Sequence, residues 1–332
     1  MEGVNKRDSV ASIDIVKLMM AIMVIAIHTK PYWGGGLIVT DLFALVSGMA
    51  VPFFFISSGY FWNNKNHQRQ IKKIAKMYII WSILYLPLDL YKALKNGVAF
   101  WKWCLIYLRN ILFIGEHYNS WHLWYLLSLL WALIFVAFLR KRKVSRIIAA
   151  FAVGVIAAVS ICLNGLDACA HDLPRTIEII KTVVSYTIMN GRILQGLYYV
   201  PLGVWIASSR TNGRCGIFVM SVLFCLFLFL RYRLINDTVM AEAILIPLSV
   251  CFFQLIRSIS IKETSIHIRI RAMSTIIYLI HMYVWTFYYL IRFHEKTFGM
   301  EPFLMTAVIC IICSYIATSP VISNMIKSPL KQ

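Results

Sequence analysis

Residues 121–164 read WHLWYLLSLLWALIFVAFLRKRKVSRIIAAFAVGVIAAVSICLN, and their pattern indicates the fold class most directly. Two apolar runs, 121–139 and 146–164, lie on either side of the basic string RKRK at 140–143. Each run has about the 20 residues that a helix needs to cross a bilayer. Short loops rich in Lys and Arg collect on the cytoplasmic side of membrane proteins. The stretch therefore predicts two transmembrane helices joined by a short cytoplasmic loop.

Similar apolar runs recur along the whole chain. Of its 332 residues 60% are hydrophobic and 14% are charged, whereas a soluble domain is about half apolar and about a quarter charged. This composition excludes a disordered chain, a fibrous repeat and an ordinary soluble enzyme. We predict an all-α, polytopic membrane bundle of about ten helices that forms a single domain over 1–332, with no separate soluble domain. The spans are expected near 13–30, 37–61, 74–91, 121–139, 146–164, 193–209, 215–233, 239–257, 273–293 and 302–325.

Residues 98–114 (VAFWKWCLIYLRNILFI) are apolar, but Lys102 and Arg109 interrupt them. We interpret this stretch as an interfacial or re-entrant helix. If it spans the bilayer instead, the number of spans becomes eleven and the later topology inverts.

The charge of the chain is strongly positive, with 33 Lys and Arg against 14 Asp and Glu and a net charge of +19. A basic soluble domain would suggest nucleic acid, but the cations here lie between apolar runs and no nucleic-acid-binding module is present. With a cytoplasmic N-terminus, the basic clusters at 65–76, 140–146 and 257–271 fall on the inner side, and most acidic residues fall on the outer side. We therefore predict that both termini are cytoplasmic and that the cations face anionic lipid.

Most of the eight cysteines lie inside apolar runs. Cys310 and Cys313 form a CxxC, but no second pair is near them, so we expect small buried side chains rather than a metal or redox centre. The sequence also has no Walker loop, dinucleotide fingerprint, HExxH or GxSxG, which argues against an ATP-driven motor, a zinc protease and a typical lipase.

The first span carries three ionisable residues, which are costly in a bilayer and so indicate function. Asp14 and Lys17 are three residues apart and can pair on one helix face. His28 follows Lys17 by eleven residues, which places it on the same face about 16 Å further along the helix. The alternative is that Lys17 snorkels to the cytoplasm and His28 sits at the outer interface.

Two other histidines stand in apolar surroundings. His122 begins the fourth span within WHLWY at 121–125, where Trp124 and Tyr125 are equally typical of an interfacial aromatic belt. His281 lies two turns into the ninth span and should face the bundle interior. Ser58 and its glycine neighbour, in FFFISSGY at 53–60, are also the kind of small residues that let helices pack closely.

Together these strings resemble the membrane acyltransferase 3 family. Its first-helix signature, Asp-x-x-Arg followed ten residues later by His, is similar to Asp14-Ile15-Val16-Lys17, ten residues and His28. FFFISSGY at 53–60 is similar to its Phe-Phe-x-x-Ser-Gly motif, and HLWY at 122–125 and YLIH at 278–281 resemble its later motifs, in order and spacing. Residues 71–91 look closest to the membrane half of the vancomycin-resistance serine racemases, whose soluble racemase domain has no counterpart here.

The resemblance implies a bacterial plasma-membrane enzyme that takes an acyl group, acetyl or succinyl, from cytoplasmic acyl-CoA, with acetyl-CoA the expected donor and no bound cofactor. The acceptor would be a hydroxyl of a cell-envelope glycan, such as a polysaccharide, or of another small molecule. The resemblance gives catalytic roles to His28, Lys17 and Asp14; acceptor-binding roles to His122, Trp124, Tyr125, His281 and Ser58; and donor-binding roles to Lys72, Lys73 and Lys76.

The chain departs from the family where Lys17, and Lys72, Lys73 and Lys76 at the start of the third span, replace arginines. Lysine keeps the charge but loses the bidentate fork that suits phosphate or carboxylate. The hypothesis is that His28 acts as general base on the acceptor hydroxyl. Two rival hypotheses remain, namely a transporter or channel for a small polar solute such as serine, and a scaffold without catalytic activity.

Overall fold

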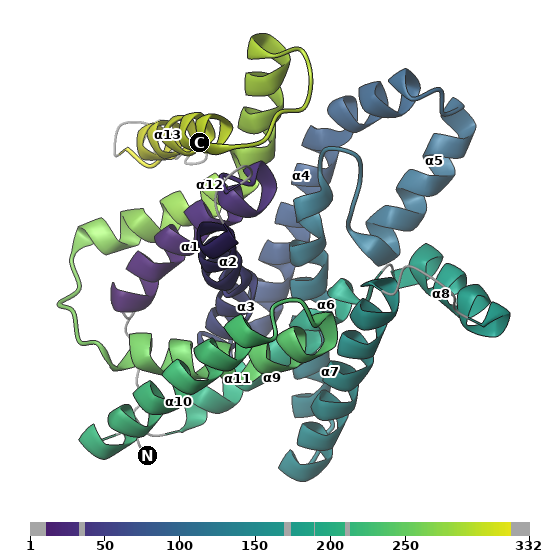
Figure 1. Cartoon of the computed structure of the whole chain (residues 1–332). Helices are drawn as coiled ribbons and strands as arrows, with labels where there is room; N and C mark the ends of the chain where they lie inside the picture. The colour runs from purple at the N-terminus through teal and green to yellow at the C-terminus, as the bar shows by residue number, and fades with distance from the viewer. Residues whose placement is uncertain (1–10, 33–36, 169–173, 189, 210–212, 320–332) are drawn as a thin grey trace, which may run out of the picture. The chain divides into compact units, whose positions relative to one another are not determined.

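The computed structural model describes residues 11–32, 37–168, 174–188, 190–209 and 213–319 (Figure 1). Every regular element among them is a helix, which confirms the all-α prediction. The chain termini and residues 320–325 of the last predicted span lie outside the described residues. The helices are α1 (Ala11–Thr29), α2 (Leu37–Gly48), α3 (Ala50–Tyr60), α4 (His67–Lys95), α5 (Phe100–Arg109), the π-helical turn η1 (Asn110–Ile114), the 3₁₀ turn η2 (Trp121–Leu123), α6 (Trp124–Lys141), α7 (Arg146–Ala168), α8 (Arg175–Ile188), the 3₁₀ turn η3 (Arg192–Leu194), α9 (Gln195–Ser208), α10 (Arg214–Arg233), α11 (Thr238–Ser258), α12 (Ser265–Arg292) and α13 (Met300–Ala317).

The chain is a polytopic membrane protein. Among the described residues, nine helical segments are long and apolar enough to cross a bilayer, one of them formed by α2 and α3 together over Val39–Tyr60. This agrees with the predicted bundle of about ten helices. The predicted span 193–209 is not among the nine, because its helix α9 has only 14 residues, or about 21 Å of helix.

The short helix α9 nevertheless contacts other protein segments at both of its ends. These segments are predicted to lie on opposite sides of the membrane. Just before it, the carbonyl oxygens of Gly191 and Ile193 accept hydrogen bonds from Ser160 and Ser128. At its other end it lines a cavity together with residues 139–149. Because α9 is largely buried among protein, it does not need the length of a helix that faces lipid.

The interrupted stretch 98–114 does not span. Its helix α5 has ten residues, about half of what a crossing needs, and it ends in the π-helical turn η1. Trp103 and Tyr107 pack against Ala93 of α4, whereas Phe100, Trp101 and neighbouring apolar side chains are exposed. The stretch is therefore a short helix with one face on α4, in agreement with an interfacial or re-entrant helix.

The contacts divide the chain into two interleaved units. The first unit comprises Met1–Phe54, Asn212–Val222 and Cys251–Gln332, and the second comprises Phe55–Thr211 and Leu223–Val250. Each unit is described separately below.

In the second unit, α3 and α9 touch through glycines. A Cβ atom added to Gly59 would clash with the carbonyl oxygen of Val200, and one added to Gly203 would clash with that of Ile56. The two backbones are therefore in direct contact. This is the close packing that the small residues of FFFISSGY predicted.

Replacing Gly203 with alanine should destabilise the protein, because the new methyl group would push α9 away from α3. An overpacked site of this kind costs roughly 1–3 kcal/mol. Gly154→Ala on α7 is the matched control, since nothing lies within 4 Å of its added Cβ atom. Thermal unfolding followed by tryptophan fluorescence should show a lower Tm for Gly203→Ala and an unchanged or higher one for Gly154→Ala. Equal Tm values would contradict the contact.

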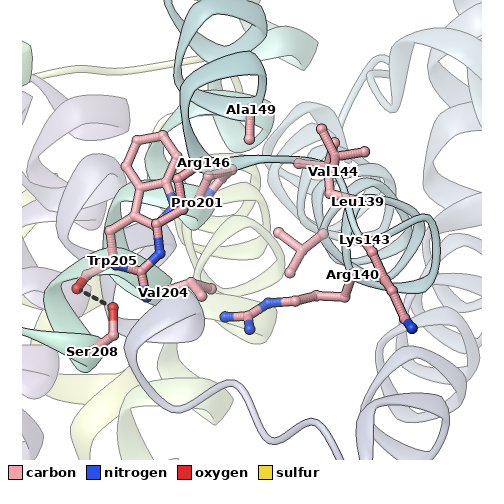
Figure 2. A pocket seen from close by; sticks show the side chains of 11 residues that line it. Leu139, Arg140, Lys143, Val144, Arg146, Ala149, Pro201, Val204, Trp205 and Ser208 are labelled. Atoms are coloured by element: carbon pink, nitrogen blue, oxygen red, sulfur yellow. Dashed lines mark hydrogen bonds between the residues drawn. The ribbon is translucent and has the colours of Figure 1, made fainter.

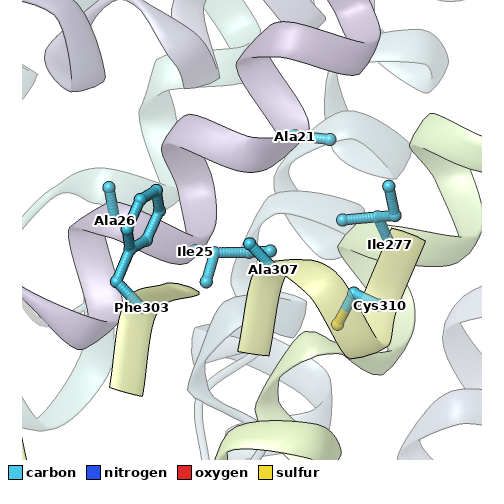
Figure 3. Close-up of a cluster of buried hydrophobic side chains, with 7 residues drawn as sticks. All are labelled: Ala21, Ile25, Ala26, Ile277, Phe303, Ala307 and Cys310. Atoms are coloured by element: carbon cyan, nitrogen blue, oxygen red, sulfur yellow. The ribbon is translucent and has the colours of Figure 1, made fainter. Parts of the chain in front are cut away.

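The second unit also holds the cavity between α6, α7 and α9 (Figure 2), which is described with the site. In the first unit, α1, α12 and α13 pack around a core of small and branched side chains (Figure 3). Ala21, Ala26 and Ala307 let these helices approach closely. Cys310 is fully buried in this core, as expected for a small apolar side chain, whereas Cys313 is exposed, contrary to the expectation.

Candidate active site

An ion pair joins α1 to α12 in the first unit. Asp14 has no exposed surface, and its two carboxylate oxygens accept hydrogen bonds from Nε and Nη2 of Arg271 at 2.9 and 2.6 Å. This bidentate geometry is among the strongest that a carboxylate can form. The sequence predicted that Lys17 can pair with Asp14, and Lys17 does interact electrostatically with this carboxylate. Arg271 is a second partner, which the sequence analysis missed.

The same two helices bring together two histidines that are far apart in the sequence. The rings of His28 and His281 are stacked, with centroids 5.1 Å apart and planes inclined by 24°. His28 follows Asp14 on α1, and His281 follows Arg271 on α12, so the two helices run parallel with the histidines at one end of the pair and the ion pair towards the other. The predicted site residues His28 and His281 thus contact each other. The helices that carry them, α1 and α12, also carry the ion pair of Asp14 and Arg271.

The hydrogen bonds of His281 fix its tautomer. Its Nδ1 lies 2.7 Å from the carbonyl oxygen of Tyr278 and 3.3 Å from that of Ile277. Because a carbonyl oxygen only accepts hydrogen bonds, Nδ1 must carry the proton. The lone pair of this buried ring is therefore on Nε2, which makes His281 an acceptor or base on that side.

The end of α1 beside His28 is tied to the segment that precedes α13. The backbone N–H of Gly299 donates to the carbonyl oxygen of Thr29 at 2.8 Å. Nearby, the indole N–H of Trp285 donates to the carbonyl oxygen of Thr297 at 3.1 Å. These bonds hold both sides of the histidine stack in place, since Thr29 follows His28 and Trp285 is one helical turn beyond His281.

His122 belongs to the second unit, where a buried carboxylate holds the loop in front of it. Asp89 accepts hydrogen bonds of 2.6 Å from the backbone N–H of Asn119 and from the hydroxyl of Ser120. The His122 ring, 1% exposed, then meets the Tyr85 ring edge-on at 5.0 Å. His122 is therefore a buried, oriented side chain and not an interfacial anchor exposed to headgroups.

The other predicted acceptor-binding residues of the second unit gather near the start of α6. The ring of Tyr125 packs on that of Phe55 at 4.6 Å, and its hydroxyl interacts with the hydroxyl of Ser58. Trp124 also contacts Phe55, at 6.2 Å between ring centroids. The side chains of Phe55 and Ser58 thus lie together with those of Trp124 and Tyr125. Their role in acceptor binding stays a prediction.

A cavity of about 340 Å³ in the second unit is lined by three cations (Figure 2). Arg140 lies in the last turn of α6, Lys143 lies in the loop that follows, and Arg146 is the first residue of α7. Across from them α9 contributes the indole of Trp205 and the hydroxyl of Ser208, which donates to the Trp205 carbonyl oxygen at 2.8 Å. The lining thus offers cations, a flat ring and a hydroxyl, a set that suits a phosphorylated ligand with an aromatic base.

The three lysines predicted to bind the donor lie elsewhere. Lys72, Lys73 and Lys76 are exposed on α4 and are not part of the lining of this cavity. Within the part of the chain that the structure describes, no group of three or more His, Cys, Asp or Glu side chains is placed to share a metal ion.

Sequence comparison gives the family of this chain. Residues 10–319 match the family described as an acyltransferase domain. No solved structure matches the chain.

The similar curated proteins are all named as racemases. An amino-acid racemase of Enterococcus faecalis is 28% identical over 283 residues, which are 76% of this chain and 36% of that protein. A second amino-acid racemase of E. faecalis is 33% identical over 125 residues, or 34% of this chain and 17% of that protein. A serine/alanine racemase of Enterococcus gallinarum is 38% identical over 93 residues, which are 24% of this chain and 13% of that protein.

This chain spans about a third of the length of the first of these relatives, so their names describe proteins with a much larger remainder. The family match, in contrast, covers nearly the whole chain and includes both the α1–α12 histidine pair and the motif residues of the second unit. The chain therefore belongs to the acyltransferase 3 family, as a multi-pass membrane protein of an acyl-transferring class.

Proposed function

We propose that this protein transfers an acetyl or succinyl group from cytoplasmic acyl-CoA to a hydroxyl of a cell-envelope glycan or of another small acceptor, in the bacterial plasma membrane. The stacked pair of His28 and His281 carries this proposal. A half-buried imidazole beside a second one of fixed tautomer is suited to moving a proton, which acyl transfer to a hydroxyl requires.

The proposed reaction is a direct displacement. His28 takes the proton of the acceptor hydroxyl as its oxygen attacks the thioester carbonyl. The new ester C–O bond forms, the thioester C–S bond breaks, and CoA leaves as a thiolate. His28 then returns the proton to that thiolate. The Nδ1–H of His281 donates to the Tyr278 carbonyl oxygen, which fixes the orientation of the ring that stacks on His28.

The basic cavity of the second unit supports the choice of donor. CoA carries several phosphate charges and an adenine ring, and Arg140, Lys143 and Arg146 provide cations close to the flat ring of Trp205. The exposed Lys72, Lys73 and Lys76 are the alternative donor site that the family resemblance predicts. Two variants that each remove three charges distinguish these two candidate donor sites.

Changing Arg140, Lys143 and Arg146 together to glutamine should raise the KM for acetyl-CoA about tenfold or more and leave kcat within about twofold, because the lost contacts bind the donor equally in the ground and transition states. Lys72, Lys73 and Lys76 changed together to glutamine form the matched control, with the same loss of three charges. Initial rates at several acetyl-CoA concentrations give both constants. A KM that rises only in the control would assign the donor to α4 instead.

The acceptor can be identified by the mass that acylation adds to it. We expect envelope glycans or small hydroxylated molecules from cells with the gene to carry an added acetyl or succinyl mass that is missing without it. Mass spectrometry of the glycan and lipid fractions reads this directly. Identical spectra from cells with and without the gene, together with no consumption of acyl-CoA by the purified protein, would overturn the proposal.

A second candidate function is transport of a small polar solute such as serine. The observation that favours it is that the similar proteins are named amino-acid and serine/alanine racemases, which act on such solutes. Proteoliposomes distinguish the two functions. Uptake of labelled L-serine without acyl-CoA would support transport, whereas acyl-CoA consumption without serine uptake supports acyl transfer.

A further inference from the structure

A second cavity, of about 380 Å³, lies within the second unit, outside the residues assigned to acyl transfer. Its walls come from α5, from η1 and the loop that follows it, and from α8. All these segments fall on the outer side in the charge map, so the structure brings together parts of the chain that are predicted to share one face of the membrane. The volume is within the range of roughly 300–1,000 Å³ that small-molecule sites occupy.

The wall contains a buried histidine with an unused hydrogen-bonding atom. His117 is 9% exposed, and its Nε2 is buried without a hydrogen-bond partner among the described residues. Its ring stacks on that of Tyr107, with centroids 4.1 Å apart. Burial, with a smaller contribution from Arg109, lowers the pKa of His117 to about 3. At neutral pH this ring is uncharged, so it presents one hydrogen-bond donor and one acceptor.

The backbone that presents His117 is fixed. Gly115 has a φ of +76°, and a Cβ atom there would lie 2.6 Å from the Cα atom of Trp124. The side-chain amide of Asn110 donates to the Glu116 carbonyl oxygen at 2.6 Å. π-Helical turns such as η1 are frequent at functional sites, and this one sets the direction in which the cavity residues point.

The two charged residues of the wall are already engaged. Arg109 donates from Nε and Nη2 to the Asn110 side-chain oxygen at 2.9 and 2.8 Å, and Glu116 pairs with Arg192 at 3.6 Å. Because both charged groups already have partners, a charged ligand would have to compete with these partners, whereas a neutral ligand would not.

Aromatic rings make up much of the remaining wall. Trp103, Tyr107, Tyr118 and Tyr186 all line the cavity, and Tyr186 also lies under the Arg109 guanidinium at 5.9 Å. The negative face of an aromatic ring attracts the slightly positive C–H groups of a ring that stacks on it. Amide, guanidinium, carboxylate and imidazole groups between such rings suit the hydroxyl groups of the same ligand.

We propose that this cavity binds a neutral sugar ring, with a hydroxyl on Nε2 of His117 and the C–H face of the sugar on the aromatic wall. None of the residues that line this cavity belongs to the histidine stack. That the bound sugar is part of the acceptor rests on the proposed function, but the binding itself does not, because it needs neither acyl-CoA nor turnover.

The test uses the full chain in lipid nanodiscs, which avoid sugar-based detergents, and saturation-transfer NMR with the methyl glycosides of glucose, galactose, mannose and N-acetylglucosamine. At least one glycoside should receive saturation. His117→Phe keeps the ring on Tyr107 and removes the nitrogen, and should weaken that binding about tenfold or more. Tyr186→Ala removes a ring that is 63% exposed and so spares the fold, and it should weaken binding to a similar extent.

The matched control is Tyr91→Ala, which removes an exposed tyrosine of α4 outside the cavity and should change binding by less than about twofold. The proposal is overturned if no glycoside binds, if binding is the same in both cavity variants as in the unaltered chain, or if L-serine displaces the glycoside. Sugar binding without acyl transfer would overturn the proposed function alone, and acyl transfer without sugar binding would overturn this inference alone.

Discussion

The His28→Ala protein should lose acyl transfer while remaining at its normal level in the membrane. General-base catalysis contributes about 10²–10⁴-fold to a rate, and the alanine variant has no group at this position that could take the hydroxyl proton. The loss should appear in kcat rather than in the KM for acyl-CoA, because proton removal happens only in the transition state. Release of free CoA from acetyl-CoA in the presence of acceptor measures it.

Two further variants separate the chemistry from the packing of the histidine stack. His281→Phe keeps a ring against His28 and removes Nε2, so it should reduce kcat less than His28→Ala does. His294→Asn is the matched control, since His294 is exposed and has a φ of +62°, which asparagine tolerates. Full activity in His28→Ala would exclude His28 as the base, and a loss in His294→Asn would show that the assay reports general damage.

The sequence predicts the helices well because their cause is local. An apolar run of about 20 residues indicates a span wherever it stands in the chain. The helix α9 is shorter than the predicted span 193–209, because hydropathy does not distinguish a helix surrounded by protein from one surrounded by lipid. Because α9 is largely buried and both of its ends contact other segments of the protein, a helix of 14 residues is long enough at this position.

The sequence indicated which residues are candidates for the site, but it indicated only some of the contacts between them. His28 and His281 stood out because ionisable side chains in a membrane indicate function, yet nothing in the sequence states that they stack. Arg271 was hidden because a cation near the cytoplasmic end of a span looks like an ordinary positive-inside residue. The available signal was Asp14, since a buried carboxylate needs a strong partner and Lys17 is not the only cation at that depth.

His117 was missed for a different reason. It lies in a loop between spans, where a single histidine normally faces water and carries no signal. Its burial depends on the π-helical turn η1 and on the stacking with Tyr107, and both follow from the packing of α5 on α4. Hydrophobic periodicity does not predict a π-helical turn, so this pocket could be found only in three dimensions.

The Arg271→Gln protein should be markedly less stable than the unaltered chain. Removing one partner of a buried ion pair costs roughly 3–5 kcal/mol, because the remaining charge is left without compensation. Asp14 has no exposed surface, but the Arg271 side chain is 41% exposed, and water screening therefore reduces the expected cost to about 2–3 kcal/mol. Thermal unfolding in one fixed lipid or detergent environment should show a clear decrease in Tm.

The Glu116–Arg192 pair provides the matched control, because it has a longer distance of 3.6 Å and side chains that are 12% and 45% exposed. Arg192→Gln should cost less than about 1 kcal/mol. The double variant Asp14→Asn with Arg271→Gln should recover much of the stability lost in Arg271→Gln, since it removes the uncompensated carboxylate and leaves two amides that can hydrogen-bond to each other. If the double variant is as unstable as the sum of the two single ones, the two side chains act independently. The bond between α1 and α12 would then not be the reason for the loss, and the parallel arrangement that brings His28 to His281 would have to rest on the apolar core alone.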